Sequence, residues 1–199
     1  MRQMLIKRLI DVFGSLTLLL LTAPLASVIC LAIATTSPGG VFFRQERTGR
    51  DGHPFVMLKF RTMRAGADAE RAALAARNEA NGHLFKLRED PRITPVGRLL
   101  RRLSLDELPQ LINVLRAEMS LVGPRPLPVA DSGYTGPARI RLSVLPGLTG
   151  LWQISGRSEL SWEEMVRLDM HYVERRSLAL DLAILARTIP AVLSARGAH

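Results

Sequence analysis

An uncharged and mostly apolar stretch, Val12–Ala34, lies near the start of the chain. As a straight helix it would be roughly 35 Å long, which is enough to cross the core of a bilayer. Pro24 stands at its midpoint and should kink the helix, so that each half reaches about 17 Å. Basic residues flank both ends: Arg2, Lys7 and Arg8 before it, and Arg44, Arg47 and Arg50 after it.

Because basic flanks favour the cytoplasmic side, a helix that enters, breaks and returns satisfies both flanks, whereas a straight span satisfies only one. We therefore predict a membrane-associated re-entrant hairpin over residues 1–40. The hydroxyl of Thr22 or Ser27 should bond backbone carbonyls that Pro24 leaves free. A single span and a signal peptide cleaved after Ala32-Ile33-Ala34 are the alternatives, and Asp11 and Pro24 fit the signal peptide poorly.

Two short segments of strand character follow the apolar stretch. Val41–Gln45 and Pro54–Arg61 are separated by a turn that contains Asp51-Gly52, a hairpin signal. Along the second segment, side chains alternate between two faces, so Lys59 and Arg61 share a face. Two cations on one face suit an anionic ligand, although a solvated face is the ordinary interpretation.

Helical spacing and propensity predict four further helices. They are an alanine-rich surface helix over Ala65–Asn81, a basic amphipathic helix over Pro95–Leu103, a helix from Ser161 to about Arg176 and an apolar helix over Leu178–Leu193. Ser161 and Glu164 have the spacing of a capping box. The basic helix would lie at the membrane interface or pack in the core with its arginines solvated. The expected fold class is α+β, mainly helical, with a small β-hairpin or sheet, and residues 41–199 are expected to form one integrated unit.

Composition narrows the choice of partner. The 199 residues carry a formal net charge of +9, with a pI near 11.0, and the cations are mostly arginines. Such a charge favours nucleic acid, anionic membrane lipids or phosphorylated substrates. Cys30 is the sole cysteine, so an intrachain disulfide is impossible, and the histidines do not have zinc-ligand spacing.

The segment Ser104–Pro126 contains an adjacent carboxylate pair, Asp106 and Glu107. Pro109 is tolerated only in the first turn of a helix, so the helix that follows must begin near the pair. Ionised acids are favoured at that end of a helix. A carboxylate held there can cap the helix, bind a metal ion or attack phosphorus, and these three roles remain open.

Several other residues are candidates for ligand contacts. Prolines on both sides of Arg125 hold its backbone, which suits phosphate recognition, although a rigid turn with a solvated arginine has the same pattern. Trp152 and Arg157 follow a tight glycine loop, and Trp152 could stack on a base or pack in the core. Asp169 shares a helix face with Tyr172, or it pairs with a neighbouring arginine.

Four long motifs resemble the bacterial sugar transferase family, the monotopic polyprenyl-phosphate phosphoglycosyl transferases. They are FFRQERTGRDGHPFVMLKFRTM (Phe42–Met63), DPRITPVGRLLRRLSLDEL (Asp90–Leu108), DELPQL with EMSLVGPRP (Asp106–Pro126) and LPGLTGLWQISGR (Leu145–Arg157). The spacing of Asp169, Tyr172 and Asp181 also matches, so the resemblance covers nearly the whole chain. It implies a re-entrant hairpin, with Ala23 standing where the family often has serine before the proline.

The resemblance also implies the chemistry. A sugar-1-phosphate would pass from a nucleoside-diphosphate sugar, usually a UDP-sugar, to polyprenyl (undecaprenyl) phosphate, with release of UMP, at the cytoplasmic face of the inner membrane. Asp106 would be the nucleophile and a Mg²⁺ ligand, with Glu107 supporting the metal or proton handling. The implied substrate-binding residues are Lys59, Arg61, Arg125, Trp152, Arg157 and Asp169.

Other function classes fit parts of the same pattern. A non-catalytic basic adaptor on the membrane would explain the charge without needing Asp106 and Glu107, and a phosphodiesterase would pass the sugar phosphate to water. The expected partners are the sugar donor, polyprenyl phosphate and anionic lipids, without nucleic acid, and homo-oligomers remain open. Larger members of the family carry an N-terminal multi-span domain. This chain is therefore expected to be either the catalytic unit alone, with residues 41–199 as its cytoplasmic catalytic domain, or a truncated part of a larger protein.

Overall fold

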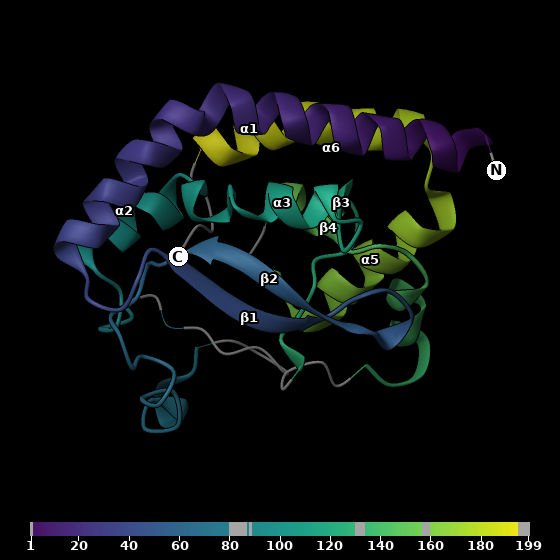
Figure 1. The fold of residues 1–199 in the computed structure, drawn as a ribbon. Helices are drawn as coiled ribbons and strands as arrows, with labels where there is room; N and C mark the ends of the chain where they lie inside the picture. Colours follow the sequence, from purple (N-terminus) through teal and green to yellow (C-terminus); the bar gives the residue numbers. More distant parts are fainter. Residues whose placement is uncertain (1, 80–86, 88, 130–133, 157–159, 195–199) are drawn as a thin grey trace.

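A computed structural model describes residues 2–79, 87, 89–129, 134–156 and 160–194. Two long helices, α1 (Arg2–Thr36) and α6 (Leu178–Leu193), both lie at the top of the view in Figure 1, and Lys7 of α1 bonds Asp181 of α6. The short helices α2 (Pro95–Arg102) and α3 (Gln110–Leu115) lie beneath them, and the hairpin of β1 (Phe42–Thr48) and β2 (Pro54–Phe60) lies on the far side. The α+β, mainly helical fold class is confirmed.

Helix α1 is continuous through Pro24 and bends along its length (Figure 1), so the expected break into two separate arms is wrong. A proline inside a helix removes one hydrogen bond and bends the axis without having to end it. Thr22 Oγ1 donates to the Leu18 carbonyl at 2.6 Å and Ser27 Oγ donates to the Ala23 carbonyl at 3.0 Å. The carbonyl that Pro24 leaves without its helical amide is that of Leu20, so these bonds are not the expected ones.

Both ends of α1 contact the same globular body. Near its C-terminus, Ile29 and Ile33 pack against Phe60 and Leu100, while Lys7 near its N-terminus bonds the carbonyl of Val122. By length and composition α1 could cross a membrane, and much of its surface is exposed and apolar. A straight span would carry one end of α1 away from that body.

The β1–β2 hairpin has the expected turn at Asp51-Gly52, and its antiparallel register pairs Phe43 with Lys59. Met57 and Lys59 belong to one face of β2, and Met57 is buried in the core with Leu111 of α3. The cation-bearing face of the strand therefore points toward the protein interior, and not into solvent.

Local signals placed the later helices well. Thr94 Oγ1 accepts from the Gly97 amide at 2.9 Å where α2 begins, and Ser161 and Glu164 form the predicted capping box of α5 (Trp162–Arg175). The predicted helix over 65–81 is wrong as far as residue 79, where the structure has turns and a 3-10 turn at Ala75–Arg77. That segment offers almost no apolar stripe, and helix propensity without burial rarely sustains a short helix.

A second, parallel sheet was missed by the sequence patterns. Strand β3 (Ser120–Val122) pairs with β4 (Gly147–Thr149), and α4 (Leu151–Ser155) follows. A Cβ on Gly147 would lie 2.0 Å from the amide nitrogen of Gly123, so only glycine allows this approach. The pairing fixes the start of the segment Gly123–Pro126, which carries Arg125.

Candidate active site

The acid pair lies in a 3-10 turn, Leu105–Glu107, which precedes α3 by two residues. Ser104 has a left-handed backbone (φ 55°) where the chain turns out of α2. The residue at the N-cap of α3 is Pro109, so neither acid occupies the capping position. The capping alternative therefore does not account for the pair.

Glu107 is held by two cations from separate parts of the chain. Its Oε1 accepts from Lys59 Nζ at 2.7 Å and from Arg125 Nη2, while its Oε2 accepts from Arg125 Nη1 at 3.1 Å. Burial by itself would raise the pKa of Glu107, but the charges of Arg125 and Lys59 lower it well below its usual range. Glu107 is consequently ionised and fully engaged.

Asp106 has the opposite environment. Its Oδ2 lies 3.7 Å from Lys59 Nζ, too far for a hydrogen bond, and its side chain is only 9% exposed. Burial raises the pKa of Asp106, the Lys59 charge opposes that rise, and the Glu107 charge adds to it. A buried carboxylate whose nearest cation in the described part of the chain lies 3.7 Å away is poorly stabilised, which suits a group that is to react.

Arg125 is held through its backbone as well as through Glu107. Its carbonyl accepts from Arg141 Nη2 at 2.9 Å, and the carbonyl of the preceding Pro124 accepts from the Gly147 amide at 2.8 Å. The predicted rigid placement of this arginine is confirmed. Its guanidinium is 26% exposed and retains N–H donors beyond those that Glu107 uses.

Asp169 stands one layer behind the site. It is buried in α5 and forms an ion pair with Arg141, so the expected alternative, pairing with an arginine, is confirmed. Burial raises the pKa of Asp169 to about 6, although the Arg141 charge opposes the rise. Asp169 therefore reaches the acid pair only indirectly, through Arg141 and the Arg125 carbonyl.

The remaining predicted residues do not meet the acid pair in the same way. Arg61 lies beyond the end of β2 and donates to the Pro38 carbonyl at 3.4 Å. Trp152 is buried in α4, which is the core alternative. Arg157 lies outside the described residues.

Two arginines were missed as parts of the site. Arg141 comes from the 3-10 segment Gly136–Ser143. Arg101, expected on the solvated side of α2, instead donates to Thr62 Oγ1 at 2.9 Å, and its charge favours the ionised form of Asp106. The cations gathered here outnumber the two acids, and such a surplus attracts an anionic substrate.

A magnesium ion was expected at the acid pair. Within the residues that the structure describes, no group of three or more His, Cys, Asp or Glu side chains gathers as a metal site. Mg²⁺ commonly takes one or two carboxylates and completes its shell with water and substrate phosphates. Asp106, which lacks a close partner, fits such a ligand, whereas both oxygens of Glu107 are already engaged by Lys59 and Arg125.

Comparison with known proteins matches residues 2–195 to the bacterial sugar transferase family. An exopolysaccharide production protein, ExoY, of Rhizobium meliloti is 45% identical over 97% of this chain and 88% of its own length. The UDP-glucose:undecaprenyl-phosphate glucose-1-phosphate transferase of Caulobacter vibrioides is 43% identical over 97% of this chain and 72% of its own. The undecaprenyl-phosphate galactose phosphotransferase of Salmonella typhimurium is 41% identical over 98% of this chain and 42% of its own.

Proposed function

The chain belongs to the bacterial sugar transferase family, and we propose that it transfers a sugar-1-phosphate from a UDP-sugar to polyprenyl (undecaprenyl) phosphate, releasing UMP. A sugar-phosphate transferase activity follows from the family and from the names of its relatives. The finer proposal rests on the different environments of the two acids. Glu107 is neutralised by two cations, while its neighbour Asp106 is buried and, among the described residues, has its nearest cation, Lys59, at 3.7 Å.

In the first step, an Asp106 carboxylate oxygen attacks the phosphorus that bears the sugar. A new O–P bond forms an acyl phosphate, and the P–O bond to UMP breaks, with UMP keeping the electron pair. The spare N–H donors of Lys59 and Arg125 would contact the diphosphate oxygens, where charge develops during transfer. Glu107 would position those two cations.

In the second step, an oxygen of polyprenyl phosphate attacks the same phosphorus. The bond to Asp106 breaks, the carboxylate is restored, and polyprenyl-diphosphate sugar leaves. Dividing the transfer lets a soluble donor and a lipid acceptor use one site in turn. Leu105 and Leu108, which flank the acid pair, pack against the hydrophobic cluster that contains Ile29 and Ile33 of α1. The exposed apolar surface of this helix supports a lipid acceptor.

A bound Mg²⁺ would supply neutralisation of the diphosphate charge. Asp106 and the donor phosphates would hold it, while Glu107 acts by fixing Lys59 and Arg125. We expect a chelator to stop UMP release without unfolding the protein, and added Mg²⁺ to restore the release.

We place both ends of α1 on the cytoplasmic side, in contact with anionic lipids, because both ends contact one globular body. Cysteines introduced by Gln3→Cys and by Arg50→Cys, each in a Cys30→Ser background, should label from the same side. Labelling from opposite sides would establish a span.

The decisive experiment is UMP release from several UDP-sugars, with and without polyprenyl phosphate. Without acceptor, the protein should release up to one equivalent of UMP and gain the mass of the sugar phosphate, with peptide mapping placing it on Asp106. Continued turnover without acceptor would indicate a phosphodiesterase. Absence of UMP release with every donor would favour the adaptor, and an adduct on another residue would refute the proposed nucleophile.

A further inference from the structure

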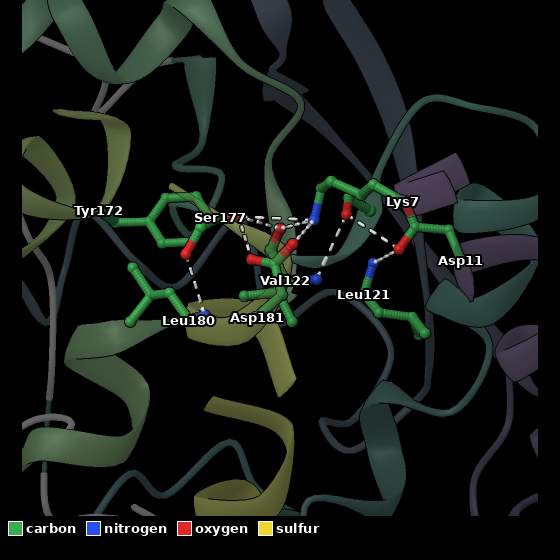
Figure 2. Close-up of polar contacts among 9 residues, drawn as sticks. Lys7, Asp11, Leu121, Val122, Tyr172, Ser177, Leu180 and Asp181 are labelled. Carbon is green, nitrogen blue, oxygen red and sulfur yellow. Dashed lines mark hydrogen bonds and ion pairs between the residues drawn. The ribbon is translucent and has the colours of Figure 1, made fainter. Parts of the chain in front are cut away.

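A second group of charged and polar side chains lies away from the acid pair, where α1 meets the rest of the protein. Lys7 of α1, Tyr172 of α5, Asp181 of α6 and the Val122 carbonyl of β3 form what we call the anchor cluster (Figure 2). Lys7 Nζ lies 2.7 Å from Asp181 Oδ2 and 3.1 Å from the Val122 oxygen. The proposed chemistry does not use these groups directly.

Counting protons identifies the donor on which the Val122 carbonyl depends. The Tyr172 hydroxyl lies 2.7 Å from Asp181 Oδ1 and 3.0 Å from the Val122 oxygen, but it has one proton to donate. The carboxylate is the closer and stronger acceptor, so the tyrosine proton goes there. Lys7, with three protons, is left to supply the carbonyl.

Asp11 holds the same strand one turn further along α1. Its Oδ1 accepts from the Leu121 amide at 2.9 Å and from Ser120 Oγ at 3.0 Å (Figure 2). Lys7 and Asp11 are separated by four residues and lie on one face of the helix. One face of α1 therefore binds β3 through both an amide and a carbonyl.

Strand β3 leads directly into the segment that carries Arg125. Val122 is followed by Gly123-Pro124-Arg125, and the Gly123 amide donates to the Thr149 carbonyl at 2.9 Å. Because Pro124 restricts the backbone between the anchor cluster and Arg125, a shift of Val122 should also move Arg125. The distance between the two charged groups of Arg125 and Glu107 depends on this segment.

We propose that Lys7 is a positioning residue for the transfer reaction: docking of α1 through Lys7 onto the Val122 carbonyl sets the position of Arg125 at the acid pair. The membrane helix is then a structural part of the active site as well as an attachment. This proposal rests on the proposed function, because it assumes that Arg125 contacts the donor phosphates.

The alternative is an anchor that only stabilises the fold, and Arg8 offers a matched control. It is the adjacent residue of α1 and carries the same charge, but it donates to the carbonyls of Val114 and Leu115 at 2.7 and 2.8 Å, at the end of α3. Arg8→Met should therefore loosen α1 without releasing β3.

The first measurement is hydrogen exchange of the backbone amides of Leu121, Val122, Gly123 and Arg125, which needs no activity. Lys7→Met should accelerate exchange there, Lys7→Arg should restore part of the protection, and Arg8→Met should leave it at the wild-type rate. Tyr172→Phe should have a smaller effect than Lys7→Met, because Lys7 keeps the Val122 bond. Unchanged exchange in Lys7→Met, or equal acceleration in Arg8→Met, would overturn the proposal; Lys7→Gln replaces Lys7→Met if that variant does not fold.

The second measurement is a double-mutant cycle between Lys7 and Arg125 on donor kcat/KM. Lys7→Met should lower kcat/KM on the order of 10- to 100-fold in the wild-type background, as misplacement of a substrate-orienting group does. It should have little further effect in an Arg125→Ala background, and additive losses would overturn the proposal. If Arg125→Ala alone leaves donor kinetics unchanged, the proposed function of Arg125 fails, while the exchange result still decides whether Lys7 controls the segment.

Discussion

The acid pair and the anchor cluster are both built from buried carboxylates and cations, but they are satisfied to different degrees. In the anchor cluster, each oxygen of Asp181 has a donor at 2.7 Å. At the acid pair, Glu107 is equally well satisfied, yet the nearest described cation to Asp106 is Lys59, at 3.7 Å. A saturated cluster holds elements together, whereas an unsatisfied carboxylate beside surplus cations is prepared to bind or attack an electrophile.

The largest effect should come from Asp106→Asn. An amide is a poor nucleophile and a poor metal ligand, so turnover should fall on the order of 10⁴-fold or more. The fold should survive, because Asp106 makes no close ion pair that would be lost. UMP release and thermal melting measure the two effects, and Asp181→Asn provides the contrast, because it should destabilise the protein instead. Normal turnover in Asp106→Asn would show that Asp106, like the anchor cluster, has no direct chemical role.

Glu107→Gln should affect both activity and stability. It leaves Lys59 and Arg125 facing a neutral amide, and breaking a buried pair commonly costs about 3 kcal/mol of folding free energy. Activity should fall on the order of 100-fold as the two cations lose their positions. Chemical denaturation and donor kinetics measure these losses, and the sugar-phosphate adduct should still map to Asp106. An adduct that disappears while donor binding persists would instead assign Glu107 a direct chemical role.

Lys59→Ala tests the role of the cations at the acid pair. Arg61→Ala is its control, because the sequence pattern predicted the same strand face for both residues. Loss of one phosphate contact costs about 2–4 kcal/mol at the transition state, so kcat/KM for the donor should fall accordingly in Lys59→Ala. Arg61→Ala should lower kcat/KM much less, because Arg61 bonds the Pro38 carbonyl. Equal effects of the two substitutions would show that proximity to Glu107 is not what matters. Arg125→Ala should resemble Lys59→Ala.

The smallest effect concerns Asp169 and pH. Burial raises the pKa of Asp169 to about 6 from 3.8, so its protonated form is favoured by the folded state. That contribution to stability is fully present below pH 3.8 and is lost as the pH rises through about 6. Asp169→Asn should remove this pH-dependent part from the free energy of unfolding, measured by denaturation between pH 4 and pH 7. The exposed control Asp51→Asn should leave the slope unchanged.

The elements that the sequence predicted well depend on interactions between near neighbours. The capping box at Ser161 and Glu164, the turn at Asp51-Gly52 and the helix over Leu178–Leu193 follow from local hydrogen bonds and sterics. The alanine-rich stretch from residue 65 was predicted wrongly because its prediction rested on local propensity and took no account of packing. Its local propensity favours a helix, but most of its described side chains are exposed and Ala67 is the one that is buried.

The sequence by itself determined which groups carry the charge: the acid pair, the rigid Arg125 and the cation on β2. The tertiary structure decided how they are paired, because Lys59 and Glu107 are 48 residues apart and Lys7 and Asp181 are 174 apart. Periodicity tells which face a side chain occupies, but it does not tell what packs against that face. The packing of α1, β3 and α3 decided that Asp106 is weakly paired, that Glu107 bonds Lys59, and that Asp169 lies behind the site, paired with Arg141.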